Sequence, residues 1–165
     1  MKICVNDWVF NVDVPLNMEI SSAQAKEHCT CGYCRNYYAA IDKACPTLRP
    51  FLANFGIDIE GPDELSPFEP TIYEASYIIN GTIAQSTQSG FFIDGIPVKV
   101  LSSQRADMDT ERPDPYFVFV VGLIELPWVL QEDPADVISP ANEAAYLQRM
   151  QNKLLSRMCD TDITS

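Results

Sequence analysis

Two dipeptides in the second half of the chain, Asn80-Gly81 and Asp94-Gly95, place the tightest constraint on the fold. Asn-Gly and Asp-Gly favour the type I′ turn of a two-residue β-hairpin, because both central residues of that turn need positive φ. Each dipeptide separates two strand-like runs: Thr71 to Ile79 and Thr82 to Gln85, and then Phe91 to Ile93 and Ile96 to Leu101. Two such signals in succession predict an antiparallel meander.

The N-terminal segment also has the pattern of a hairpin. Lys2–Val5 and Trp8–Val12 flank a polar Asn6-Asp7 turn, and each run has the composition of a short strand. Leu16 to Ile20 is expected to add one more short strand.

Two segments indicate their own positions within the sheet. Pro97 has no N–H to donate to a neighbouring strand, so its strand is expected at an edge. Phe117 to Leu126 is apolar on both faces, which predicts a central strand covered on both sides.

Apolar residues at helical spacing predict short helices in the first half of the chain. One helix follows Cys34 and is expected to end near Ala44, because Pro46 disfavours helical backbone before it. A second helix begins near Thr47 and ends at Gly56, a residue suited to a C-terminal cap.

Two further segments are expected to be helical. Pro62-Asp63-Glu64-Leu65 is predicted to form one turn, and Ser139-Pro140 is predicted to open a C-terminal amphipathic helix. The apolar stripe of that helix consists of Leu147, Met150, Leu154 and Met158. The sequence therefore predicts an α+β fold, an antiparallel sheet with helices on one side or end, in a single domain over residues 1–165.

The chain is strongly acidic, with a net charge of -12 and only 11 Lys and Arg residues. Because nucleic acids and anionic membranes attract clustered Lys and Arg, neither is an expected partner. The acidity favours solubility, and it also suits a basic protein partner. No apolar run approaches the ~18 residues of a membrane span, and no signal-peptide core is visible. The expected location is the cytoplasm, with reduced cysteines.

The segment from His28 to Cys34, with sequence HCTCGYC, holds three of the six cysteines and the single histidine. Thiolate and imidazole are preferred zinc ligands, and C-x-x-C is the spacing of one half of a zinc site. The first interpretation is therefore a structural zinc site. Its predicted ligands are Cys29, Cys31, Cys34 and His28, with Cys4 or Cys159 as further candidates. Cys45 is excluded if it shares an unbroken helix with Cys34, because about 16 Å of axis would separate them.

A second interpretation is redox chemistry. Cys31-Gly32-Tyr33-Cys34 at a helix start resembles the active-site motif of the glutaredoxin and thioredoxin group, and Pro70-Thr71-Ile72 resembles the proline that faces the dithiol there. The resemblance implies a thiol–disulfide oxidoreductase with Cys31 and Cys34 as catalytic residues. Two features depart from that pattern: polar residues precede the motif where a buried strand belongs, and a βαβ crossover before Pro70 is missing.

A third interpretation makes the cysteines structural, because a free cysteine behaves as a small hydrophobic residue. Cys4, Cys45 and Cys159 are expected to have this role. The clustered cysteines would then form only a tight entry into the helix.

Three separate strings resemble a family of small acidic bacterial proteins that has a C-x-C-x-x-C-R-N segment and no known activity. They are Cys31 to Tyr38, then Leu48 to Glu64 with the pattern L-x-x-F-L-x-x-F-G-I-D followed by P-x-E, and Glu125 to Leu130. The resemblance implies a class and no mechanism. Some small acidic bacterial proteins of this size bind and neutralise toxins, so by analogy alone a toxin is one conceivable partner.

Common catalytic and cofactor motifs are missing: the chain has no G-x-S-x-G, P-loop or G-x-G-x-x-G. We therefore expect a non-enzymatic binding or interaction protein, with the structural zinc site as a feature and the oxidoreductase as the alternative. A partner surface would expose aromatic residues. The candidates are Trp128, Tyr73, Tyr77 and Phe92.

Overall fold

The computed structural model describes residues 1–137, 148, 151–152 and 155. The chain divides into two compact units, Met1–Val129 and Leu130–Ser165. In the second unit, helix α5 covers Pro134–Val137. The C-terminal helix predicted from Ser139 lies mainly outside the described residues, and the single domain over residues 1–165 stays a prediction.

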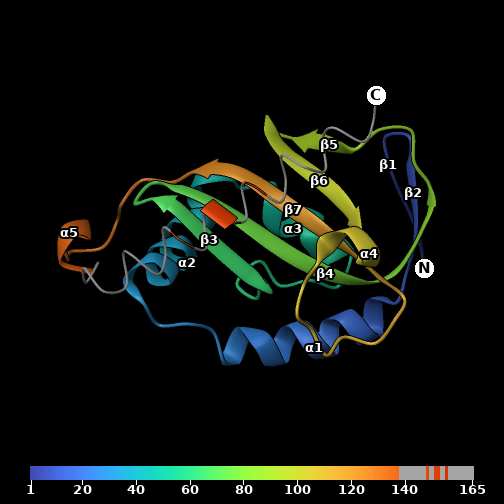
Figure 1. The fold of residues 1–165 in the computed structure, drawn as a ribbon, viewed down its shortest axis with the longest axis horizontal. Coiled ribbons are helices and arrows are strands. Elements are labelled where there is room, and N and C mark those ends of the chain that lie inside the picture. Colours follow the sequence, from blue (N-terminus) through green and yellow to red (C-terminus); the bar gives the residue numbers. More distant parts are fainter. Residues whose placement is uncertain (138–147, 149–150, 153–154, 156–165) are drawn as a thin grey trace. The chain divides into compact units, whose positions relative to one another are not determined.

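The first unit has the predicted α+β architecture, built on an antiparallel sheet of seven strands (Figure 1). The strands follow the order β1-β2-β4-β7-β6-β5, and β3 pairs with β4. Their bounds are Lys2–Val5 (β1), Trp8–Val12 (β2), Glu64–Glu69 (β3), Ile72–Gln85 (β4), Gly90–Ile93 (β5), Ile96–Ser102 (β6) and Tyr116–Glu125 (β7).

Two of the predicted hairpins are confirmed. Strands β1 and β2 pair in antiparallel register around the Asn6-Asp7 turn, with Val5 opposite Trp8. Strands β5 and β6 pair around Asp94-Gly95, whose φ angles of 47° and 80° are both positive. The second turn therefore has the backbone that the Asp-Gly dipeptide favours.

The hairpin predicted at Asn80-Gly81 is wrong, because β4 runs straight through this dipeptide. Asn80 is the last residue of β4 that pairs with β7, and Gly81 is the first that pairs with β2, opposite Val12. Gly81 has φ of 153°, and a Cβ there would lie 2.3 Å from the carbonyl oxygen of Asn11. The glycine thus permits a close approach of two backbones, not a reversal of the chain.

Strand β7 is central, as predicted, with β4 on one side and β6 on the other. The expectation that Pro97 marks an edge strand is wrong, because β6 lies between β7 and β5. The pairing of β6 with β7 begins at Val98, one residue after Pro97. The N–H that Pro97 lacks therefore lies outside the hydrogen-bonded pairing of β6 with β7. For this reason an interior strand can contain the proline.

Two predicted helices are confirmed. Helix α2 covers Gly32–Ala44, and α3 covers Leu48–Asn54 with Thr47 as its N-terminal cap. Gly56 follows α3 with φ of 78°, the left-handed conformation expected just beyond a helix.

Two local predictions on either side of these helices are wrong. The expected strand at Leu16 to Ile20 lies inside helix α1, Val14–Lys26, whose first turn is capped by Asp13. The buried positions of α1 are the polar Asn17 and Ser21, so the helix lacks an apolar stripe. The predicted helical turn at Pro62 to Leu65 is also wrong, because the backbone there enters β3.

The core lies mainly between the sheet and helices α2 and α3, which stand behind the sheet in Figure 1. Four fully buried rings meet at its centre, with centroids 4.9 to 5.6 Å apart: Phe10, Phe55, Phe117 and Phe119. A smaller cluster of Ile78, Val118 and Val120 lies apart from this core, where Ala106 of the short helix α4 (Ser103–Ala106) packs. The larger core fixes α2, and so the cysteine segment at its start.

Candidate functional site

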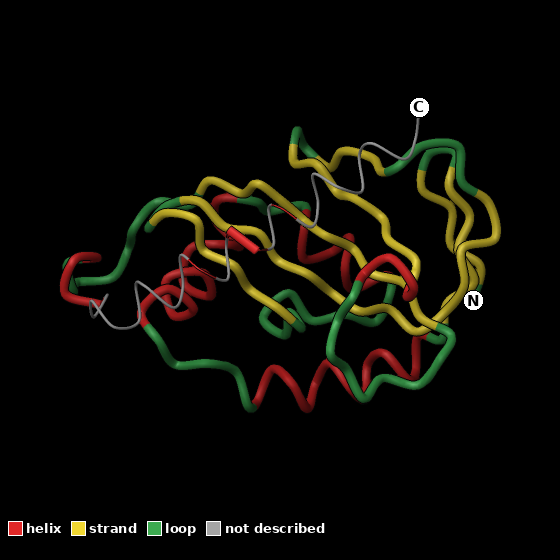
Figure 2. Tube along the Cα trace, in the orientation of Figure 1, coloured by secondary structure: helices red, strands yellow, loops and turns green. Residues whose placement is uncertain are grey.

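The cysteine segment connects α1 to α2, where Figure 2 draws a loop between two helices. Cys31 occupies the N-terminal cap of α2 in extended backbone conformation. Arg35, in the first turn of α2, donates from Nε to the carbonyl oxygen of Thr30 at 3.0 Å. This contact folds the loop back against the helix that follows it.

The structure brings three of the four predicted ligands together. The Sγ atoms of Cys29, Cys31 and Cys34 all lie within 4.8 Å of one another. Two sulfurs on a tetrahedral zinc ion with bonds of 2.3 Å are about 3.8 Å apart. The three thiols are free and not joined in disulfides, so one metal ion is within reach of all of them.

The three thiols differ in exposure. Cys29 and Cys31 are exposed, whereas Cys34 is buried with 8% of its surface accessible. The backbone N–H of Cys31 donates to Sγ of Cys29 at 3.4 Å. The cluster therefore has one inner sulfur and two outer sulfurs, next to the N–H groups of a helix start.

The thiols also differ in acidity. A hydrogen bond from the Cys34 thiol is the main cause that lowers the pKa of Cys31 to about 5, and backbone N–H groups of Cys34 and Tyr33 add to it. The same hydrogen bond, together with burial, raises the pKa of Cys34. The hydrogen bond between the two thiols therefore favours the thiolate form of Cys31 and the protonated form of Cys34.

His28 does not belong to the group of three sulfurs. Its ring stacks on Tyr38 of α2, with centroids 4.2 Å apart and planes 15° from parallel. Its assignment as a metal ligand stays a prediction.

Among the described residues, two more cysteines, Cys4 and Cys45, lie outside this group. Cys45, at the C-terminal cap of α2, is buried in the core, as expected for a structural cysteine. Cys4 on β1 is exposed, so its expected role as a core residue is wrong. Cys159 lies outside the described residues.

Two polar contacts of α2 hold the helix in place, and no pattern in the sequence predicts either of them. The buried Asn36 donates from Nδ2 to Tyr73 Oη at 3.2 Å and to the Pro127 carbonyl at 3.1 Å, and its Oδ1 accepts from the Val129 N–H at 2.8 Å. Burial raises the pKa of Tyr73 to about 12, which keeps its hydroxyl protonated. The bonds of Asn36 join α2 to the segment that follows β7, across about ninety residues of sequence.

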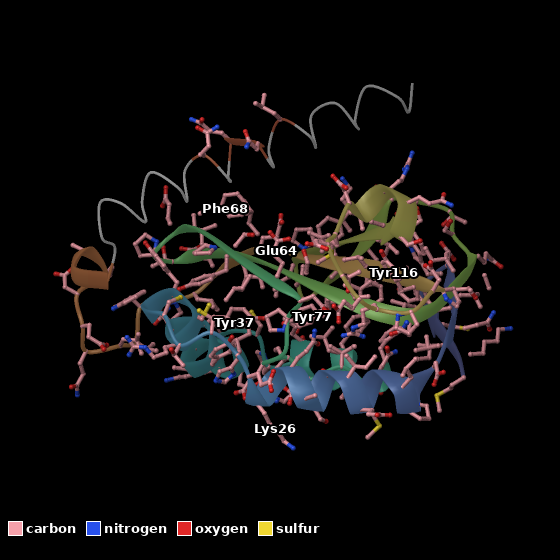
Figure 3. The ribbon with its side chains drawn as sticks, turned by 60° about the horizontal axis from the view of Figure 1, so that its bottom comes forward. Lys26, Tyr37, Glu64, Phe68, Tyr77 and Tyr116 are labelled. Atoms are coloured by element: carbon pink, nitrogen blue, oxygen red, sulfur yellow. The ribbon has the colours of Figure 1, made fainter. Side chains whose placement is uncertain are left out.

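The second contact pairs two tyrosines under the sheet. Tyr37 of α2 and Tyr77 of β4 approach to 2.6 Å between their hydroxyl oxygens, and Figure 3 shows the two labelled residues close together. Tyr77 donates onward to the carbonyl of Ile59 at 2.8 Å, so Tyr37 is the donor to Tyr77. These bonds satisfy two buried hydroxyls and fix the rotation of α2.

The aromatic residues proposed as a partner surface are not all exposed. Tyr73 and Tyr77 are wrong as surface candidates, because both are fully buried. Phe92 is 71% exposed on β5. Trp128 is partly exposed and meets the ring of Tyr33 edge to face, with centroids 6.1 Å apart.

The surroundings of Cys31 and Cys34 differ from the glutaredoxin and thioredoxin pattern. The motif follows helix α1 and a loop, not a strand, and every strand pairing in the described sheet is antiparallel. Pro70 lies in the turn between β3 and β4. The local C-x-x-C arrangement at a helix start is nevertheless present.

Comparisons with known proteins found no relative: no protein-family model matches the chain, and the searches of curated proteins and of solved structures returned no match. None of the helices in the described part of the chain combines the length and hydropathy needed to cross a bilayer.

Proposed function

We propose that this chain is a non-enzymatic binding protein that holds a thiophilic metal ion, with zinc as the first candidate, at Cys29, Cys31 and Cys34. The proposal depends on one observation, that three free sulfurs lie within 4.8 Å of one another. A purely structural role for the cysteines would not require this convergence.

The donor set supports a soft ion. Thiolates favour zinc, Cu(I) and related ions over Mg²⁺ or Ca²⁺, which take oxygen ligands. Zinc with three thiolates would carry one net negative charge, and the N–H groups at the start of α2 offset part of that charge.

The position of the site supports a structural and binding role. An ion at the three sulfurs would tie the loop between α1 and α2 to the first turn of α2. The net charge of -12 supports a basic protein as the partner, and a reducing compartment such as the cytoplasm suits the free thiols.

The proposal is tested by measuring bound metal. The protein is purified with a phosphine reductant, loaded with zinc or Co²⁺, desalted and analysed by elemental analysis and absorption spectroscopy. We expect one ion per chain and a sulfur-to-cobalt charge-transfer band.

Matched variants localise the ion. Cys31→Ser and Cys34→Ser are expected to lose the ion or bind it far more weakly, whereas Cys4→Ser, an exposed cysteine outside the group, keeps it. Metal content near zero in the wild-type protein would refute the proposal.

A second candidate function is thiol–disulfide exchange by Cys31 and Cys34. The favouring observation is geometric: the exposed Cys31 caps a helix of 13 residues, and the buried Cys34 lies directly behind it. Cys31 would attack a substrate disulfide, and Cys34 would then attack the mixed disulfide. The first attack releases one substrate thiolate, which takes a proton from solvent in place of the one that Cys31 lost on ionising. The second attack releases the other thiolate, which takes the Cys34 proton, so the substrate becomes two thiols and the protein gains a Cys31–Cys34 disulfide.

Trapping separates this candidate from metal binding. If the protein exchanges disulfides, Cys34→Ser accumulates a mixed disulfide between Cys31 and one half of a small disulfide probe. The wild-type protein instead releases this half as a thiol. If the wild-type protein keeps the mixed disulfide as long as the variant does, Cys34 does not resolve it and the candidate fails.

A further inference from the structure

We propose that a metal ion held by Cys29, Cys31 and Cys34 keeps one coordination position that an outside thiolate can enter, which makes the site suited to passing its ion to a thiol-bearing acceptor. The inference rests on the proposed metal binding and adds the class of ligand that the metal site receives.

The number of protein ligands leaves one position of a tetrahedral ion open. Within the part of the chain that the structure describes, three side chains form the metal-binding group, whereas tetrahedral zinc takes four ligands. The neighbouring imidazole of His28 is engaged in a stack on Tyr38. Structural zinc sites fill all four positions with protein atoms, and sites that exchange a ligand keep one position for an incoming molecule.

The exposure of two of the three sulfurs gives an outside ligand access to the ion. Cys34 is the buried sulfur of the group, and Cys29 and Cys31 are exposed. An ion held by these three sulfurs would therefore face solvent on the side away from Cys34. The hydrogen bond from Arg35 to the carbonyl oxygen of Thr30 holds the loop that carries the two exposed sulfurs against α2.

The charges around the site affect the binding of an incoming thiolate. A fourth thiolate adds negative charge at the start of α2, where the helix dipole and the N–H groups favour an anion. The net charge of -12 opposes an incoming anion. That repulsion is spread over the chain and is screened beyond about 8 Å at physiological salt, whereas the helix start acts at contact distance. Zinc with three thiolates already carries one net negative charge, so a fourth thiolate brings the centre to a net charge of minus two, and the N–H groups at the start of α2 offset part of that charge.

The exchange itself needs no oxidant or reductant. The entering thiol releases its proton to solvent as its sulfur–metal bond forms, and the water at the fourth position leaves. A protein sulfur then gives up its bond to the metal and takes a proton from solvent. Repetition of this step moves the ion to the acceptor with its charge unchanged.

The test uses the full chain loaded with one equivalent of Co²⁺ and titrated with 2-mercaptoethanol. We expect a saturable shift of the visible cobalt bands and a stronger sulfur-to-cobalt charge-transfer band, with the cobalt still bound to the protein after desalting at low thiol. In a second sample, loaded with zinc in place of cobalt, release of zinc to a chromophoric chelator should accelerate in proportion to thiol concentration. A cobalt spectrum that thiol does not change, or a zinc release rate that does not depend on thiol, would overturn the inference.

Two variants identify a fourth ligand from the chain itself. If His28→Ala or Cys159→Ser alters the cobalt spectrum before thiol is added, the chain fills the fourth position and the inference fails, although metal binding stands. If the wild-type protein binds no cobalt, the proposed function fails first. Unchanged spectra in both variants, together with the thiol-dependent shift, support the open position.

Discussion

Replacing Arg112 with Met removes one partner of a buried ion pair that links the loop before β7 to the start of β3. Arg112 Nη2 lies 3.4 Å from Asp63 Oδ1, and the two side chains are only 4% and 8% exposed. Arg112 also donates to Asn80 Oδ1 at 3.2 Å and to Gln24 Oε1 at 2.9 Å. Removing one partner of a buried pair leaves the other charge without compensation, so we expect a loss of about 3–5 kcal/mol in the free energy of unfolding.

The loss should depend on pH, and the pKa of Asp63 gives its sign. Burial already raises the pKa of Asp63, and Arg112 opposes that rise. Without Arg112 the folded-state pKa rises further above the unfolded value of about 3.9. A carboxyl with a raised pKa adds stability at low pH, and this contribution is lost as pH rises through the folded pKa. The difference in unfolding free energy between wild type and Arg112→Met should therefore narrow as the pH falls from neutral towards the unfolded-state pKa of about 3.9.

Urea unfolding followed by tryptophan fluorescence at several pH values measures this effect. Arg105→Met is the matched control, because Arg105 is exposed on α4 and its removal should change stability by less than about 0.5 kcal/mol. Adding Asp63→Asn to Arg112→Met should recover part of the loss, since no buried charge then remains at the pair. A loss below about 1 kcal/mol for Arg112→Met, or a loss that does not change with pH, would refute the reasoning.

Two further predictions concern the sheet and its core. Gly81→Ala should destabilise the protein by more than about 2 kcal/mol, because it combines an unfavourable φ with a 2.3 Å contact, whereas Gly95→Ala meets open space and should cost about 1–2 kcal/mol from its φ alone. Equal losses in urea unfolding would contradict this. Phe119→Ala should cost about 3–5 kcal/mol, because the ring is fully buried, and the 71% exposed Phe92→Ala should cost less than about 0.5 kcal/mol. A small loss for Phe119→Ala would show that the described core is wrong.

The sequence predicts those parts of the fold whose signal is local. The Asp94-Gly95 turn is specified by its own two residues. The ends of α2 and α3 follow from Pro46 and Gly56, which act on the backbone beside them. These elements could be found without knowledge of the tertiary structure.

The wrong predictions concern segments whose structure depends on contacts with distant parts of the chain. Asn80-Gly81 has the composition of a turn, yet the backbone N–H of Asn80 donates to Oδ1 of Asn17, more than sixty residues away, and Gly81 permits a close approach to β2. Helix α1 was missed because it buries Asn17 and Ser21 and lacks an apolar stripe. Periodicity of apolar residues cannot detect a helix whose buried face is polar.

The sequence predicts only the local part of the candidate site. Three cysteines within six residues are a local signal, and the structure brings their sulfurs together. The position of His28 depends on Tyr38, and the position of α2 depends on Asn36 and its bonds to the end of β7. These contacts join distant segments, so spacing along the chain does not reveal them.

X-ray absorption at the zinc edge of the loaded wild-type protein shows directly whether the sulfurs of Cys29, Cys31 and Cys34 bind one metal ion. We expect a shell of three sulfurs at about 2.3 Å from zinc in the wild-type protein, and little or no bound zinc in Cys31→Ser under the same loading. A shell containing only nitrogen or oxygen neighbours at about 2.0–2.1 Å would contradict binding by the three cysteines.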